Sequence, residues 1–227
     1  MVTTVYLIRH CEAQGNTNGT FQGHTDCDVS GNGRVQLDLL SIRCRNLPLD
    51  AIYSSPLKRA YCTAEAVGRY HKIKIQTDPR LEEINGGDCE GTRWDDFSKN
   101  FPQQNQEWYQ TPWNFAAPHG ETMRQVYDRT WQAMEDIVDK NQGKTIAVVS
   151  HGCAIRNLLC HAMGKKLEQI NDVNWCDNTA VSILKFSSPK ALPKIVLLND
   201  ASHLTPEVSV FAHQGWWKKE NQMEEPS

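Results

Sequence analysis

Two histidines and two arginines each stand close behind a short apolar run of the sequence: Arg9, His10, Arg59 and His151. Guanidinium groups match the oxygens of a phosphate dianion in pairs. An imidazole attacks phosphorus at neutral pH when one of its ring nitrogens is unprotonated and correctly aimed. Taken singly, such a histidine or arginine is more often structural than functional. Brought together, the four side chains would form an anion site that contains its own nucleophile.

The segments around these residues predict the elements that position them. Six apolar, β-branched runs are expected to be strands: 5–8, 51–53, 73–75, 145–149, 181–186 and 195–198. Most of them are continuous rather than alternating, as in strands covered by helices on both faces. Four segments have helical character: 33–44, 56–70, 121–138 and 151–163. This alternation predicts an α/β fold, a three-layer α/β/α sandwich with a largely parallel sheet.

Such a sheet would bring the four residues together at one edge. The carboxyl ends of parallel strands share that edge, where open α/β folds bind ligands. Arg59 falls in the first turn of an expected helix, and His151-Gly152 opens another. Helix N-termini offer free N–H groups and positive dipole ends to an anion. The sequence therefore predicts a phosphate-binding site at this edge.

Composition narrows the class of protein. A chain of 227 residues suits one buried domain, and a net charge of −3 without long basic runs argues against nucleic acid as a partner. No apolar run reaches the length of a membrane span and the N-terminus lacks a signal-peptide pattern, which favours the cytoplasm. The eight cysteines are scattered without a C-x-x-C pair. Reduced thiols are therefore expected, rather than a zinc site or a disulfide framework.

Residues 92–119 fit the alternation of strands and helices poorly, because the segment is polar and rich in aromatic residues. A long irregular insertion of this kind is often a lid or a binding loop. A helical excursion whose aromatic side chains only pack on the body is an equal alternative. The tail after residue 217 is rich in Lys, Glu, Gln and Pro and is expected to be mobile. Both segments are assigned to a single domain, residues 1–227.

Six sets of residues, in order along the chain, resemble the motifs of a known family. They are Leu7-Ile8-Arg9-His10, Phe21-Gln22-Gly23-His24-Thr25-Asp26, Ser54-Ser55-Pro56-Leu57-Lys58-Arg59-Ala60, Leu81-Glu82-Glu83-Ile84 with Gly87-Asp88-Cys89-Glu90-Gly91, His119-Gly120-Glu121-Thr122, and Ser150-His151-Gly152. They look like the successive motifs of the histidine phosphatase superfamily, which contains cofactor-dependent phosphoglycerate mutases and many phosphatases. The resemblance runs from about Val5 to at least Asn178, and residues 198–204 are similar to the phosphatase branch. It implies a phosphoglycerate mutase-like fold.

The resemblance also implies a role for each matched residue. His10 would be the nucleophile and would form a phosphohistidine. The phosphoryl oxygens would be held by the side chains of Arg9, Arg59, His151 and Asn16 and by the backbone near Gln22, Gly23 and Gly152. One carboxyl would act as acid and then as base, and the motif places this role on Glu83, although Glu82 competes for it. The arginines would take the place of a metal, so that neither a metal nor a cofactor is expected.

Cys11 departs from the family pattern, which usually has glycine after the nucleophile. It adds a Cβ at a tight bend and so puts the local backbone fit in question. Activity is still expected, because the groups that bind and transfer phosphate are all present. A thiol this close to the anion site leads to the hypothesis that alkylation of Cys11 slows turnover.

Two other phosphatase classes match less well. A cysteine-dependent phosphatase needs an arginine six positions after its nucleophile, and none of the eight cysteines has one. Asp26-Cys27-Asp28-Val29-Ser30 resembles the aspartyl-phosphate motif of magnesium-dependent phosphatases. That motif should follow a buried apolar strand, whereas residues 21–25 are not an apolar run. A requirement for magnesium would revive this alternative.

Within the family, the sequence favours a phosphatase that hydrolyses a small phosphorylated metabolite. A phosphoglycerate mutase should have extra basic residues around its substrate, and residues 92–119 contain only Arg93 and Lys99. A catalytically weak phosphate-binding module on the same fold is the second alternative. The identity of the substrate and the oligomeric state are left open, and no membrane partner is expected.

Overall fold

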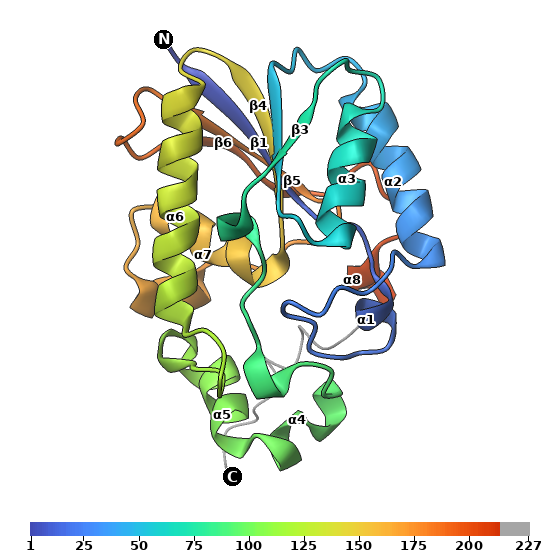
Figure 1. Cartoon of the computed structure of the whole chain (residues 1–227), viewed down its shortest axis with the longest axis vertical. Coiled ribbons are helices and arrows are strands. Elements are labelled where there is room, and N and C mark those ends of the chain that lie inside the picture. The colour runs from blue at the N-terminus through green and yellow to red at the C-terminus, as the bar shows by residue number, and fades with distance from the viewer. Residues whose placement is uncertain (214–227) are drawn as a thin grey trace.

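A six-stranded sheet lies at the centre of the computed structural model, which describes residues 1–213 (Figure 1). Its strands are Thr3–Arg9 (β1), Ala51–Ser54 (β2), Ile75–Thr77 (β3), Thr145–Ser150 (β4), Val181–Phe186 (β5) and Lys194–Asp200 (β6). They lie in the order β3-β2-β4-β1-β5-β6. The first four strands pair in parallel, whereas β5 is antiparallel to both β1 and β6. The prediction of an α/β fold with a largely parallel sheet is confirmed.

Helices cover both faces of this sheet. The α-helices are Gln14–Thr17 (α1), Gly31–Cys44 (α2), Lys58–Gly68 (α3), Trp94–Asn100 (α4), Pro102–Gln110 (α5), Met123–Lys140 (α6), Gly152–Ala162 (α7) and Val210–His213 (α8). Short 3₁₀ helices are Pro79–Leu81 (η1), Gly87–Cys89 (η2), Pro112–Asn114 (η3) and Leu167–Asp172 (η4). Ile8 joins Leu40 of α2 in one apolar cluster, and Leu7 joins Met134 of α6 in another. Successive residues of β1 thus face opposite layers, as a strand requires.

The outer strands differ from the central ones. β1, β2 and β4 are buried over nearly all of their length, in agreement with their continuous apolar runs. β6 instead alternates between exposed and half-buried residues, because it is an edge strand with one face turned to solvent. β3 begins at Ile75, later than the predicted 73–75, at the point where this residue pairs with Ile52.

The segment 92–119 is helical rather than irregular, and it forms α4, α5 and η3. Figure 1 shows α4 and α5 in green at the end of the molecule towards which β1 runs from the N-terminus. Phe97 and Phe115 are fully buried and stack on Phe21, with ring centroids 5.7 and 6.3 Å from it. These aromatic side chains anchor the segment to the connection between α1 and α2, which contains Phe21.

Three further predictions concern the C-terminal tail, membrane-spanning helices and the cysteines. The tail after residue 217, predicted to be mobile, lies outside the described residues. Among residues 1–213, no helix combines the length and the apolar character needed to cross a bilayer. All eight cysteines fall within this range and are free thiols.

Candidate active site

His10 lies directly after the carboxyl end of β1 and is only 3% exposed. Its backbone is fixed from two sides, because its N–H donates to the Ser150 carbonyl and its own carbonyl accepts from the Asn178 side chain. The ring atom Nδ1 lies 2.5 Å from the carbonyl oxygen of Cys11. A carbonyl oxygen only accepts, so Nδ1 carries the proton and Nε2 keeps its lone pair. The nucleophilic nitrogen is therefore Nε2.

The surroundings of His10 keep its ring neutral. Burial, followed by the charges of Arg59 and Arg9, holds its pKa well below the ordinary value of 6.5. Only the hydrogen bond to the Cys11 carbonyl acts in the opposite direction. A neutral imidazole with a free lone pair is the form that can attack phosphorus.

His151 faces His10 across the site, with ring centroids 5.0 Å apart. It stands between β4 and α7, and its Nε2 lies 2.7 Å from Ser55 Oγ. Ser55 Oγ accepts from the N–H of Leu57 and keeps its own proton to donate to the ring. Burial and the charge of Arg59 lower the pKa of His151, so that the ring is neutral. Its single proton is then assigned to Nδ1, which is buried without a partner within residues 1–213.

Arg9 and Arg59 are almost completely buried, being 3% and 1% exposed. Carbonyl oxygens orient both guanidinium groups. Arg9 donates to Cys176, and Arg59, in the first turn of α3 as predicted, donates to Gly23 and Thr25 at 2.7 and 2.8 Å. Their Nε atoms are buried without a partner in the described part of the chain. Buried donors of this kind are costly unless an acceptor satisfies them, which an anion would do.

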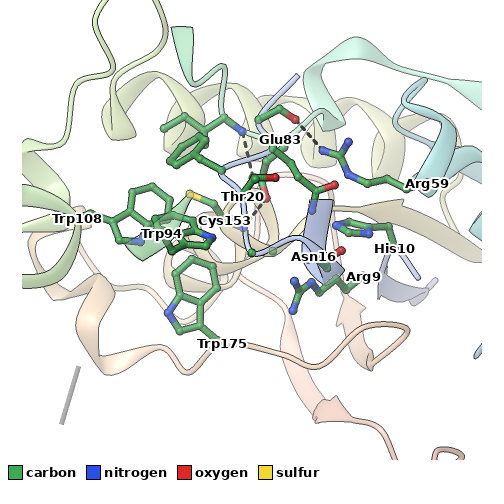
Figure 2. A pocket seen from close by; sticks show the side chains of 16 residues that line it. Arg9, His10, Asn16, Thr20, Arg59, Glu83, Trp94, Trp108, Cys153 and Trp175 are labelled. Atoms are coloured by element: carbon green, nitrogen blue, oxygen red, sulfur yellow. Dashed lines mark hydrogen bonds between the residues drawn. The ribbon is translucent and has the colours of Figure 1, made fainter. Parts of the chain in front are cut away.

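Glu83 and Glu82, which competed for the acid role, point in different directions. The Glu83 carboxylate lines the pocket and accepts N–H donors from Ile84, Cys153 and Ala154 at 2.9–3.0 Å. Glu82 instead lies 3.4 Å from His24 Nε2, away from the pocket lining. The structure thus brings Glu83, and not Glu82, into the pocket that His10, Arg9 and Arg59 also line (Figure 2).

The hydrogen bonds of Glu83 also distinguish its two oxygens. Oε1 accepts from both Ile84 and Ala154, whereas Oε2 accepts only from Cys153. Because each carboxylate oxygen offers about two lone-pair positions, the open position lies on Oε2. A transferable proton would therefore be carried by Oε2.

Arg129 of α6 holds the backbone that carries Glu83. Its guanidinium uses all five N–H donors: three bond to the carbonyl oxygens of residues 80, 82 and 83, and two bond to the Glu121 carboxylate. Burial alone would raise the pKa of Glu121, but the bonds to Arg129 hold it below its ordinary value. The sequence reasoning missed this residue. Its only signal was Glu121 within a family motif.

The four remaining predicted residues also line the pocket: Asn16, Gln22, Gly23 and Gly152. Gly23 has a φ of +48°, and a Cβ there would lie 2.3 Å from Glu90 Oε1, so that only glycine fits. Gly152 begins α7 beside the Arg9 guanidinium. Gln22 Oε1 is buried without a partner within residues 1–213.

Cys11 fits its position without strain, because it is not among the described residues with positive φ. Its thiol is fully buried and contacts the Arg59 carbonyl, and burial raises its pKa to about 12. Little reactive thiolate forms at neutral pH, which weakens the hypothesis that alkylation at Cys11 slows turnover.

The aspartates of the alternative magnesium motif serve the structure locally. Asp26 accepts the N–H of Lys58 at the start of α3, and Asp28 pairs with the Lys58 side chain at 3.1 Å. Both aspartates are exposed and neither follows a strand. Among residues 1–213, no group of three or more His, Cys, Asp or Glu side chains is arranged to hold a metal ion.

Comparisons with known proteins agree with this geometry. Residues 5–201 match the model of the histidine phosphatase superfamily (branch 1). Phosphoserine phosphatase 1 of Hydrogenobacter thermophilus is 31% identical, over 92% of this chain and 97% of its own. Phosphoglycerate mutase-like protein 4 of Arabidopsis thaliana is 32% identical, over 93% and 90%. The solved structure of Bacillus stearothermophilus YhfR has a TM-score of 0.84 at 31% identity, covering 88% of this chain and 98% of that one.

The chain therefore belongs to the histidine phosphatase superfamily, as its motifs predicted. Its enzyme class is that of the phosphomonoester hydrolases of this family. The names of the relatives differ in the substrates they imply, so the substrate has to be argued from the pocket itself.

Proposed function

We propose that this protein is a metal-independent phosphatase that hydrolyses a small phosphomonoester through a phosphohistidine on His10. One observation carries the proposal. Nε of Arg9, Nε of Arg59 and Nδ1 of His151 are all buried without a partner in the described part of the chain, and all three residues surround His10. A phosphoryl group beside His10 Nε2 would satisfy these donors with its oxygens.

In the first step, Nε2 of His10 bonds to phosphorus while the bond from phosphorus to the ester oxygen breaks. Glu83 donates the proton of Oε2 to the departing alcohol. The guanidinium groups and His151 stabilise the charge on the three remaining phosphoryl oxygens. Two fixed positive charges supply what a divalent metal supplies in other phosphatases.

In the second step, water attacks the phosphorus of phospho-His10. Glu83, now ionised, accepts a proton from this water, and the bond from nitrogen to phosphorus breaks. Inorganic phosphate leaves, and His10 and Glu83 return to their starting protonation states. One carboxyl group thus serves as acid and then as base.

A phosphoglycerate mutase would instead return the phosphoryl group to a bound acid. This would require further cations to hold the carboxylate of that acid. Arg9 and Arg59 are the only cationic side chains among the described residues that line the pocket, and both lie next to His10. This favours hydrolysis. A cytoplasmic location without nucleic acid or membrane partners remains a prediction, and the oligomeric state remains open.

The test is hydrolysis of p-nitrophenyl phosphate in the presence of EDTA, with His10→Ala as the comparison. The wild type should turn over without added metal, and His10→Ala should lose at least about 10⁴-fold in kcat, as expected for a missing nucleophile. Circular dichroism should show that the variant is folded. A wild-type rate that requires magnesium, or a His10→Ala variant that keeps its rate, would contradict the proposal.

A further inference from the structure

The pocket has two chemically different ends (Figure 2). His10, Arg9, Arg59 and Asn16 gather at one end, and three tryptophans gather at the other. Glu83 and Cys153 lie between them, so the scissile bond of an ester would lie near Glu83, with its alcohol towards the indoles. The indole end would therefore contact the alcohol of a bound ester.

The three tryptophans come from separate segments: Trp94 begins α4, Trp108 lies in α5 and Trp175 follows η4. They support one another. The Trp108 ring lies 5.7 Å from that of Trp94, 6.1 Å from that of Trp175 and 4.9 Å from that of Phe115. Trp108 is buried, whereas Trp94 and Trp175 are half-buried. The rings thus form a braced aromatic surface with two partly accessible indoles.

Charge is distributed unequally between the two ends. Arg9 and Arg59 are both turned to the phosphate end and are tied there to backbone carbonyls. Behind Trp175, the Arg156 guanidinium lies 4.7 Å from the indole centroid and donates to Val173, but it is not part of the pocket lining. Among the described residues that line the pocket, a carboxylate on the alcohol would face indole rings instead of a cation. The electron-rich faces of these rings disfavour an anion, and its desolvation would not be compensated.

We propose that the substrate of this site is the phosphate ester of a neutral alcohol that carries a flat unsaturated ring, which stacks on Trp94 and Trp175. The inference rests on the proposed phosphatase function. It excludes phosphoserine and phosphoglycerate as preferred substrates, although relatives carry names based on them. A carbocyclic aryl ring and a nitrogen heterocycle share the required chemistry, and the experiment separates them.

The experiment compares kcat/KM for esters of primary alcohols, so that leaving groups are similar. They are 2-phenylethyl phosphate, a nucleoside 5′-monophosphate, propyl phosphate and phosphoserine. The ring-bearing esters should exceed propyl phosphate and phosphoserine by about tenfold, in line with the strength of stacking on aromatic side chains. The two ring esters reveal whether a carbocycle or a heterocycle fits better.

Variants of the half-buried tryptophans connect this preference to the indoles. Trp94→Leu and Trp175→Leu should each lower the ratio of ring ester to propyl ester by about fivefold to tenfold. Trp113→Leu is the matched control, because Trp113 packs against the same apolar core but does not line the pocket. Its ratio should stay at the wild-type value.

The outcomes separate this inference from the function on which it rests. If kcat/KM for phosphoserine or propyl phosphate equals or exceeds kcat/KM for the ring esters, the inference is overturned and the proposed function stands. Equal ratios in the wild type and in both tryptophan variants overturn the inference as well. No hydrolysis of any ester, p-nitrophenyl phosphate included, overturns the proposed function and the inference together.

Discussion

The phosphate end and the indole end of the pocket are built from different kinds of segment. The phosphate end is formed by residues at the ends of strands and at the starts of the helices that follow them, where the backbone is packed and buried. These residues are Arg9, His10, Arg59 and His151. The indoles come from α4, α5 and the connection after η4, which lie outside the sheet. Charge and nucleophile are thus fixed by the core, whereas selectivity depends on attached segments. The chemistry and the choice of substrate can therefore be changed separately.

Among the variants that compare the two ends, the largest effect is expected at the phosphate end, from Arg59→Lys. Lysine keeps the charge but cannot reproduce the planar fork, so kcat/KM should fall about 10²–10³-fold. The loss should be equal for ring-bearing and propyl esters, because both present the same phosphoryl group. Arg80→Lys is the matched control, since Arg80 pairs with Asp78 and Asp136 outside the pocket. If the loss in kcat/KM caused by Arg59→Lys differed between the two kinds of ester, the two ends of the pocket would not act independently.

Glu83→Gln should act at the boundary between the two ends. Without its proton donor, the enzyme should lose about 10²-fold in kcat/KM with propyl phosphate, because kcat/KM reports the steps up to phosphorylation of His10. The loss with p-nitrophenyl phosphate should be only a few-fold, because p-nitrophenolate leaves without protonation. The kcat/KM values of the two esters measure the difference, since loss of the base in the second step lowers kcat for both esters alike. Equal losses in kcat/KM with both esters would remove Glu83 from the acid role.

Arg129→Lys should give a weaker form of the same pattern. Lysine cannot make five hydrogen bonds, so the backbone of Glu83 should shift. The Glu83 carboxyl group should then no longer be aligned with the leaving oxygen. We expect about a tenfold lower kcat/KM with propyl phosphate and a change below twofold with p-nitrophenyl phosphate.

The control for Arg129 is Arg124→Lys on the same helix, where Arg124 is exposed and pairs with Glu168. This variant should keep both values of kcat/KM. If Arg129→Lys lowered both values by the same factor, its role would be general stability rather than placement of Glu83.

The smallest expected effect is that of pH. Because the pKa of His10 is lowered by burial and by two arginines, its neutral form persists below pH 6.5 and is lost only as pH falls through the lowered value. With p-nitrophenyl phosphate, kcat/KM should therefore change less than about twofold between about pH 7.5 and pH 6. An imidazole of ordinary pKa would lose about fourfold over this interval. An acid limb centred near 6.5, with the fold intact by circular dichroism, would contradict the lowered pKa.

That the residues of the phosphate end lie together could be predicted from the sequence for a physical reason. Arg9, His10 and His151 follow continuous apolar runs, which are typical of buried central strands in a parallel sheet. Parallel strands leave the residues after them at a common edge, so that chain order alone brings them together. The sequence of an edge strand such as β6 is less informative about its position, because burial constrains only one of its faces.

The indole end and the support of Glu83 could not be predicted in the same way. Trp94 and Trp175 are far apart in the sequence, and no period or motif states that they share a pocket with Trp108. Arg129 resembles any other charged residue on an amphipathic helix until the carbonyls of η1 and the residues after it are placed against it. Contacts of this kind depend on tertiary packing, which local patterns do not encode.

The most direct test of the central claim is to trap the phosphoryl group during turnover. A labelled phosphomonoester, mixed with the wild type and quenched within the first turnover, should leave phosphate on the ring of His10. Peptide mapping by mass spectrometry identifies the residue. Phosphate on any other side chain, or turnover without a labelled protein under conditions that would preserve phosphohistidine, would contradict the account.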